Sequence, residues 1–179
     1  AGMLYWSVTG VQMCALSIIT LQYLLITAKV KHGGNIIRVT STIKCEWNTF
    51  VAFNLALTLA QANNRILIVG GDLRNPQLQW YEPDAKNIKV VSDFLVSEDL
   101  EVINYIKNSS HHPNLDILPS GMIPPNPAVL WRDGKTESMF AQLKKMYDFI
   151  ILETAPAMLV TDTFLISKYA DLTLYVMRA

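Results

Sequence analysis

Two short runs of strand-forming residues with a helical segment between them constrain the fold of this chain most strongly. NIIRVTS (35–41) is short, rich in β-branched residues and preceded by two glycines, as expected of a buried strand. ILIV (66–69) is a continuous apolar run, typical of a strand covered on both faces. From Thr49 onward, valine, leucine and alanine recur at helical spacing. Together they predict a βαβ unit with parallel strands and a right-handed crossover.

The same alternation of strands and helices continues to the end of the chain. We expect further strands at 115–121, 147–154 and 172–178. We expect helices at 91–95, 100–105, 137–146 and 164–169, and a proline-fixed loop entering a helix at 122–131. The predicted fold class is therefore α/β, with a mainly parallel β-sheet flanked by helices.

The loop between the first strand and the helix, TIKCEWN (42–48), stands where phosphate-binding folds hold an anion at a helix N-terminus. Such loops use glycines for close backbone approach, a lysine for charge, and a Ser or Thr hydroxyl for magnesium. Thr49 is well placed as the hydroxyl, but the glycines and the lysine are absent. The loop is either a functional phosphate-binding loop or a structural turn.

Two carboxylates follow buried strands. Asp72 stands just past 66–69, with Arg74 two residues on, and Glu153 ends the apolar part of YDFIILET (147–154). Because ligands bind at the carboxyl ends of parallel strands, we expect Thr49, Asp72 and Glu153 to converge on one crevice. There Asp72 would meet a metal or a hydroxyl proton, and Glu153 the magnesium shell. The alternatives are a turn-forming Asp and a Glu that reaches solvent at the sheet edge.

Composition favours one globular domain and argues against several classes of partner. The 179 residues suffice for one full core, and 15 basic residues balance 15 acidic ones, so no strong field favours nucleic acid. The two cysteines and three histidines lack metal-site spacing, which predicts no zinc site and no disulfide framework and fits a reducing compartment.

The first thirty residues stand apart. Residues 1–28 contain no Asp, Glu, Lys or Arg and precede Lys29 and Lys31, which makes a weak membrane segment one interpretation. SVTGVQMCALSI (7–18) resembles the conceptual translation of a sequencing-library adapter, which makes an adapter-derived artefact another. We therefore separate an uncertain apolar segment, 1–30, from a domain at 31–179.

Four segments in order resemble one known family. They are VTSTIKCEWNTFVAFNLALTLAQ (39–61), RILIVGGDLRNPQL (65–78), LDILPSGMIPPNPAVLW (115–131) and YDFIILETAPAMLVTDTFLISKYADLTLYVMR (147–178). Together they resemble the cytoplasmic domain of bacterial tyrosine kinases, the BY-kinases of capsule and exopolysaccharide assembly. That family is a branch of the P-loop ATPases related to the MinD/ParA type. PSGMIPPNP (119–127) is the most discriminating piece, since MinD and ParA relatives do not typically share it.

The resemblance implies a three-layer P-loop NTPase-like fold and a protein-tyrosine kinase, acting on itself, that uses ATP and Mg²⁺. It implies a cytoplasmic location at the inner face of the bacterial plasma membrane. Its implied partners are a polysaccharide co-polymerase or membrane adaptor protein and further copies in a homo-oligomer. The site residues that it implies are Ser41, Glu46, Asn48, Thr49 and Phe50 for ATP, Asp72, Arg74 and Glu153 for catalysis, and Thr49, Asp72 and Glu153 for the metal.

The chain departs from the family pattern at the centre of each nucleotide motif. The family loop reads approximately Ser-x-x-Pro-Gly-Glu-Gly-Lys-Ser/Thr; here Lys44, Cys45, Trp47 and Asn48 replace its Pro, two Gly and Lys, while Ser41, Glu46 and Thr49 match. Gly70 replaces the first Asp of an Asp-x-Asp-x-Arg motif, and Glu153 replaces an Asp. We therefore predict a kinase with degenerate Walker motifs and weak ATP binding. The alternatives are a non-catalytic scaffold of the same fold and a MinD/ParA-like ATPase.

Two further family features are missing from the sequence. The Glu-x-x-Arg-x-x-Arg helix expected before the first strand is not found at 21–31, and the tyrosine-rich tail would lie beyond Ala179. We therefore expect a domain truncated at its C-terminus.

Overall fold

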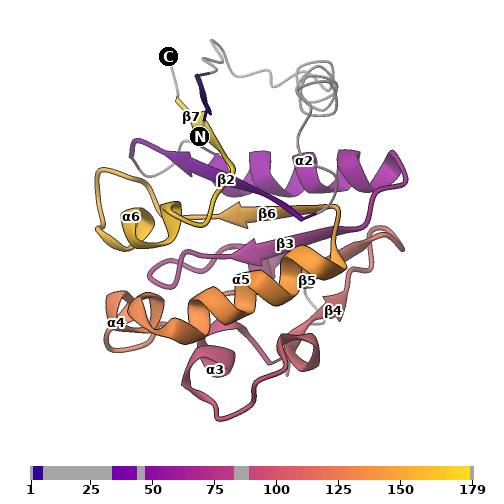
Figure 1. Cartoon of the computed structure of the whole chain (residues 1–179). Coiled ribbons are helices and arrows are strands. Elements are labelled where there is room, and N and C mark those ends of the chain that lie inside the picture. The colour runs from indigo at the N-terminus through magenta and orange to yellow at the C-terminus, as the bar shows by residue number, and fades with distance from the viewer. Residues whose placement is uncertain (1, 6–33, 44–46, 83–88, 178–179) are drawn as a thin grey trace.

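A seven-stranded sheet forms the centre of the molecule (Figure 1). The computed structural model describes residues 2–5, 34–43, 47–82 and 89–177. The strand order is β1-β7-β2-β6-β3-β5-β4, and every neighbouring pair is parallel except β4 with β5. The strands are β1 (Gly2–Tyr5), β2 (Asn35–Ser41), β3 (Ile66–Gly70), β4 (Lys107–Asn108), β5 (Leu115–Leu118), β6 (Phe149–Glu153) and β7 (Leu172–Val176).

Helices cover both faces of this sheet. The described helices are α2 (Asn48–Gln61), α3 (Val91–Val96), α4 (Pro127–Arg132), α5 (Gly134–Met146) and α6 (Asp162–Ser167), with the 3₁₀ helices η1 (Leu78–Tyr81) and η2 (Val102–Tyr105). The buried side of α2 packs on one face, and α3 to α6 pack on the other, where α5 runs across the strands in Figure 1. The result is a three-layer α/β arrangement.

Burial on both faces of the sheet explains the apolar sequences of the two central strands, β3 and β6. In β3, Ile66 and Ile68 belong to the core cluster under α2, whereas Leu67 and Val69 belong to the cluster on the opposite face. Every residue of β3 and β6 is buried. A strand covered on both faces has no solvent side on which polar residues would alternate.

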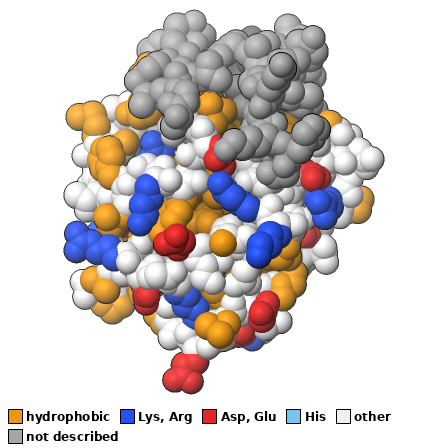
Figure 2. Space-filling view, in the orientation of Figure 1, with side chains coloured by type: hydrophobic (Ala, Val, Ile, Leu, Met, Phe, Trp, Pro, Cys, Tyr) orange, Lys and Arg blue, Asp and Glu red, His pale blue; other side chains and the backbone are white. Residues whose placement is uncertain are grey.

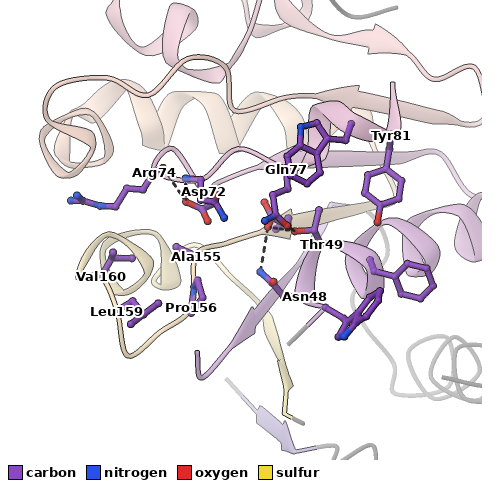
Figure 3. Close-up of a pocket in the computed structure, with 15 residues that line it drawn as sticks. Asn48, Thr49, Asp72, Arg74, Gln77, Tyr81, Ala155, Pro156, Leu159 and Val160 are labelled. Atoms are coloured by element: carbon purple, nitrogen blue, oxygen red, sulfur yellow. Dashed lines mark hydrogen bonds between the residues drawn. The ribbon is translucent and has the colours of Figure 1, made fainter. Parts of the chain in front are cut away.

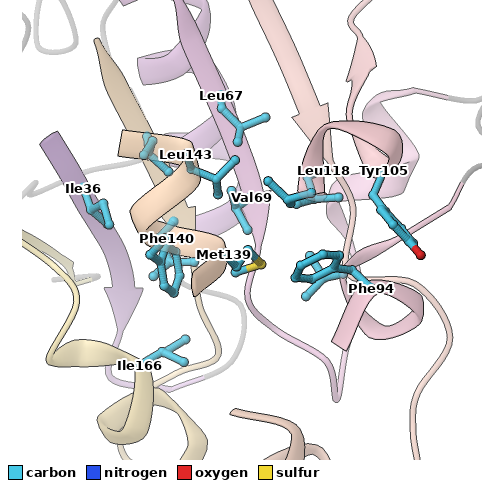
Figure 4. Close-up of a cluster of buried hydrophobic side chains, with 14 of the residues drawn as sticks. Ile36, Leu67, Val69, Phe94, Tyr105, Leu118, Met139, Phe140, Leu143 and Ile166 are labelled. Atoms are coloured by element: carbon cyan, nitrogen blue, oxygen red, sulfur yellow. The ribbon is translucent and has the colours of Figure 1, made fainter. Parts of the chain in front are cut away.

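The larger helical face is packed around α5. Met139, Phe140 and Leu143 from α5 are buried with Leu67 and Val69 of the sheet (Figure 4). Spaced three or four residues apart, these α5 side chains share one face of the helix, as expected for a helix on a sheet. This face of the core holds the β3 and β6 ends in place.

The predicted fold class is confirmed: the sheet is mainly parallel and flanked by helices. The strand predicted at 35–41 is β2, with the same bounds. The strands β1 and β4 and the helix η1 were not predicted. β4 has only two residues, too few for a periodic pattern.

The N-terminal interpretations fall mostly outside the described residues. Residues 6–33 are not described, while the short strand β1 pairs in parallel with β7. Within the described ranges, none of the helices combines the length and apolar character that crossing a bilayer requires.

Charged side chains of both signs are interspersed on the face shown in Figure 2. This mixture matches the equal numbers of basic and acidic residues in the sequence. On this face the described residues form no extended patch of one sign.

Candidate functional site

The carboxyl ends of β2, β3 and β6 meet at one edge of the sheet, where a pocket opens. Gly70 at the end of β3 lies beside Glu153 at the end of β6. The pocket has a volume of about 720 Å³. Its lining comes from the start of α2, from the segment between β3 and the end of η1, and from the segment after β6. The lining residues are Trp47, Asn48, Thr49, Phe50, Asp72, Arg74, Asn75, Gln77, Trp80, Tyr81, Glu153, Ala155, Pro156, Leu159 and Val160.

The floor of the pocket is a hydrogen-bonded cluster around Glu153 (Figure 3). The Thr49 hydroxyl donates to Glu153 Oε1 at 2.9 Å, and the Asn48 amide donates to the same oxygen at 3.3 Å. The Asn48 amide also donates to the Thr154 carbonyl at 2.9 Å. Both side chains at the start of α2 are therefore held against the end of β6.

Burial favours the protonated form of Glu153. The side chain is 1% exposed, and burial together with the nearby Asp72 carboxylate raises its pKa to about 8, although the Thr49 hydrogen bond opposes this shift. Its second oxygen, Oε2, is buried and has no hydrogen-bond partner among the described residues. Because Oε1 accepts the hydrogen bonds from Thr49 and Asn48, Oε2 is the oxygen that carries the hydrogen in the protonated form, and in the ionised form it would favour a further donor or a cation.

Asp72 performs a structural task while it lines the pocket. Its Oδ1 accepts hydrogen bonds from the backbone N–H groups of Arg74 and Asn75, both at 2.9 Å. This is the turn-stabilising arrangement that the sequence left open as an alternative. It does not exclude a site role, because Asp72 also lies on the pocket beside Thr49 and Glu153.

Arg74 is engaged by a carboxylate that the sequence did not single out. Its guanidinium contacts Asp162 through two bonds, Nε to Oδ2 at 2.6 Å and Nη2 to Oδ1 at 3.2 Å. Figure 3 shows the Arg74 side chain extending away from Thr49 and Asn48. The pair joins the segment after β3 to the first residue of α6 and fixes one side of the pocket.

Trp47 occupies a backbone conformation that favours glycine. It precedes α2 as the N-cap residue with φ 62° and ψ 23°, in the left-handed region. Its indole is 64% exposed, lines the pocket and contacts Phe50 edge-on, with ring centroids 5.9 Å apart. A non-glycine residue in this region costs on the order of 1–2 kcal/mol.

Two more aromatic residues line the pocket from η1. Tyr81 stacks on Phe53 of α2 with ring centroids 4.3 Å apart, and burial, with a smaller contribution from Glu153, raises the pKa of its hydroxyl. The neighbouring Trp80 is 70% exposed. Neither residue was predicted at the site, because η1 is too short to show a periodic pattern.

Gly70 is closely packed rather than open toward the pocket. A Cβ built on this residue would lie 2.6 Å from the backbone nitrogen of Ser120, closer than real Cβ contacts. Replacing Gly70 with Asp to restore the family motif would therefore require Ser120 to move. The missing carboxylate at this position cannot be restored by a single substitution without strain.

The structure brings together six of the eight residues expected at the site. Thr49, Asp72 and Glu153 converge as expected, and Asn48, Phe50 and Arg74 line the same pocket.

The other two expected residues do not join this set. Ser41 is buried at the end of β2 and does not line the pocket. Its hydroxyl donates a hydrogen bond to the Ile43 carbonyl at 3.0 Å. Glu46 falls in 44–46, outside the described residues. Asp162, Trp80 and Tyr81 complete the site without having been predicted.

The two expected ligands differ in how well these residues fit them. Mg²⁺ prefers oxygen ligands, and Thr49, Asp72 and Glu153 offer a hydroxyl and two carboxylates, including the unpartnered Glu153 Oε2. No group of three or more His, Cys, Asp or Glu able to hold a metal occurs among the described residues, so the hydroxyl would be needed as a ligand. A triphosphate fits poorly, because Asn48 stands where the family loop carries a lysine. The Asn48 amide already donates hydrogen bonds to Glu153 and Thr154.

Fold and site together define an α/β domain of the P-loop NTPase-like class. A family model described as AAA domain matches residues 47–174, which is more than half of the chain. The chain belongs to this family.

Within this class the chain is similar to tyrosine-protein kinases. It is 28% identical over 154 residues to the tyrosine-protein kinase wzc of Salmonella typhimurium, a match that covers 84% of this chain and 21% of that protein. It is 31% identical over 138 residues to the tyrosine-protein kinase CpsD of Streptococcus agalactiae, covering 77% of this chain and 59% of that protein. The chain thus spans only part of the length of these curated relatives.

Solved structures place it in the same superfamily. The chimerical protein CapA2B2 has a TM-score of 0.83 at 26% identity, over 96% of this chain and 78% of that one. The Pyrococcus furiosus cell division ATPase MinD has a TM-score of 0.68 at 26% identity, over 80% of this chain and 59% of that one. The chain is therefore a member of the P-loop MinD/ParA-like superfamily whose relatives include tyrosine-protein kinases.

Proposed function

We propose that this chain is a tyrosine-kinase-type domain, serving capsule or exopolysaccharide synthesis, whose binding of Mg-ATP and transfer of phosphate to tyrosine are impaired. The observation that carries the proposal is the pocket itself. Thr49, Asp72 and Glu153 lie together at the strand ends, while the lysine position holds an asparagine bound to Glu153. The residues that would surround a metal are present, and the one that would bind the outer phosphates is replaced.

Each pocket residue receives a role in this proposal. Thr49, Asp72 and Glu153 would hold Mg²⁺, which when bound neutralises charge on phosphate oxygens. Asp72 is also placed to accept a proton from a hydroxyl group. Arg74 is a positioning residue, since its guanidinium is bound to Asp162.

Two replacements set the size of the impairment. A charge-assisted hydrogen bond of the kind that lysine makes is worth roughly 1.5–3 kcal/mol, and Asn48 cannot make it. The second replacement, Trp47, places an indole on the lining of the pocket; its left-handed backbone is already present without ligand, so that strain lowers stability rather than affinity. The lost lysine contact alone corresponds to a factor of roughly ten to a few hundred in affinity.

The proposed cellular setting follows from the similarity to bacterial tyrosine-protein kinases. We propose a cytoplasmic domain at the inner face of the bacterial plasma membrane, with a polysaccharide co-polymerase or membrane adaptor protein as its partner. A homo-oligomer is the proposed assembly. Co-purification of the chain with such an adaptor, from membranes that contain it, tests this setting independently of catalysis.

A second candidate is a non-catalytic scaffold with the same fold. It is favoured by the closed cluster in which Asn48 and Thr49 both donate to the buried Glu153. A MinD/ParA-like ATPase is a weaker alternative, because the curated relatives reported above are named as tyrosine kinases.

Phosphate transfer separates the first two candidates. The chain and a restored variant, Cys45→Gly/Trp47→Gly/Asn48→Lys, are incubated with Mg-[γ-³²P]ATP and a tyrosine-containing copolymer of Glu and Tyr. We expect label on the copolymer from the restored variant, little from the chain as it stands, and none after Asp72→Asn is added to the restored variant. A restored variant that is folded and binds ATP but transfers no label would favour the scaffold.

A further inference from the structure

Four aromatic side chains line one pocket, and they have no part in phosphate chemistry. We call Trp47, Phe50, Trp80 and Tyr81 the aromatic wall. They come from the start of α2 and from η1, two segments that lie side by side around Thr49 in Figure 3, where Tyr81 is labelled. Single exposed tryptophans are common on proteins, but two that line the same pocket indicate a binding surface.

Part of this wall is held in place before any ligand arrives. Tyr81 is stacked on Phe53, and the Trp47 indole is braced edge-on against Phe50. Trp47 and Trp80 remain more than half exposed, at 64% and 70%. A ring that stacks on Trp47 would therefore gain contact area at little cost in ordering that side chain, and Trp80 offers further exposed surface.

The charges of the pocket oppose a polyanion. Arg74 is the one lysine or arginine among the described lining residues, and its guanidinium is occupied by Asp162. Asp72 presents a carboxylate, and the floor is closed by Glu153 with Asn48 and Thr49. Among the described lining residues, added phosphate groups would thus meet the Asp72 carboxylate and no lysine or arginine that is not already paired.

Hydrogen-bonding groups suited to a neutral ring lie beside the wall. Gln77 and Asn75 place amide groups on the pocket, and Gln77 Oε1 is 3.4 Å from the Thr49 hydroxyl. Amides both donate and accept, which matches the mixed edge of a nucleobase. Apolar walls with a few polar groups are the usual composition of small-molecule sites.

We propose that this pocket binds a neutral planar heteroaromatic ring, a nucleobase or nucleoside, against the aromatic wall, and that it prefers this ligand without a triphosphate. The inference rests on the proposed function in that it concerns the same pocket and names the ligand class that the altered residues favour. It goes beyond that function because it reverses the preference expected of a site built for phosphates.

Calorimetry of the whole chain with adenosine, AMP and Mg-ATP tests this order. We expect adenosine to bind most tightly and Mg-ATP about tenfold more weakly, since the Asn48 amide is held by Glu153 and Thr154 and offers the phosphates no cationic contact. Trp80→Ala should weaken adenosine binding about tenfold, because one base stacked on an aromatic side chain is worth about 1–3 kcal/mol. Phe164→Ala is the matched control, since Phe164 is 61% exposed and does not line the pocket.

Trp47→Gly separates this inference from the proposed function, because the two ligands should respond in opposite directions. Adenosine should bind more weakly and Mg-ATP more tightly. If the restored variant described above fails to bind Mg-ATP while adenosine behaves as expected, the proposed function fails and the ring site stands.

Three results would overturn the inference. They are tighter binding of Mg-ATP than of adenosine by the unaltered chain, no adenosine binding by a chain that unfolds cooperatively on heating, and unchanged adenosine binding in Trp80→Ala. Tighter binding of N-acetyl-tyrosinamide than of adenosine would also contradict it, because the ligand class would then be a phenol.

Discussion

The sheet interior and the rim of the pocket differ in how completely their residues are satisfied. Leu67 and Ile151 are fully buried on opposite faces of neighbouring strands, each within a cluster of apolar side chains. At the pocket, Trp47 has a left-handed backbone, Trp80 is exposed and Glu153 Oε2 has no partner among the described residues. The interior obeys the rules of stable packing, and the rim departs from them.

This difference shows which property each region preserves. The two core clusters contain no described residue of the loop at 42–48, so the fold survives changes at that loop. The phosphate chemistry depends on a few positions that cannot replace one another, so changes there remove binding while the fold remains. A chain can therefore belong to a nucleotide-binding family by its packing and still differ from it in ligand preference.

The largest expected effect is in the interior. Leu67→Ala should lower the free energy of unfolding by about 3 kcal/mol, because it removes buried contacts and leaves a cavity. Phe164→Ala, at an exposed position, should change it by less than about 0.5 kcal/mol. Urea unfolding followed by circular dichroism measures both. Equal losses would break the contrast between interior and surface.

A pH-dependent effect comes next and belongs to the pocket floor. The folded-state pKa of Glu153 is about 8, above its ordinary 4.5, so its contribution to stability is present below pH 4.5 and is lost as the pH rises toward 8. Between pH 5.5 and 7.5 the unfolding free energy should fall by up to about 1.4 kcal/mol per pH unit from this group. Glu153→Gln should remove that slope. Parallel curves for the two proteins would show that Glu153 is ionised in the folded chain.

The smallest effect tests backbone strain at the rim. Trp47→Gly should be more stable than Trp47→Ala by about 1 kcal/mol, because alanine keeps the Cβ that disfavours φ near +60°. The added freedom of glycine in the unfolded chain reduces this difference. Urea titrations of the two variants measure it directly. An alanine variant at least as stable as the glycine variant would mean that the left-handed conformation is not strained.

The sequence was sufficient for the sheet and only partly for the site. β2, β3 and β6 are buried on both faces, so their apolar and β-branched residues predicted strands. Parallel topology then predicted that Thr49, Asp72 and Glu153 share one edge of the sheet, and they line one pocket.

Three features of the site depended on contacts between distant segments. The Arg74–Asp162 pair spans 88 residues, η1 is four residues long, and the close packing of Gly70 on Ser120 joins the end of β3 to the segment after β5. No local periodicity encodes such contacts. Trp47 was recognised as a departure from the loop pattern, but its left-handed backbone became visible only in the structure.

The central claim is that this domain keeps the fold of a nucleotide-binding kinase while its altered loop weakens triphosphate binding. Calorimetry with Mg-ATP on the chain and on Cys45→Gly/Trp47→Gly/Asn48→Lys tests it most directly, with Gly70 left unchanged because of Ser120. We expect the restored variant to bind roughly ten to a few hundred times more tightly, the factor that corresponds to the roughly 1.5–3 kcal/mol of the lysine contact. Micromolar binding by the unaltered chain, with no gain on restoration, would contradict the claim.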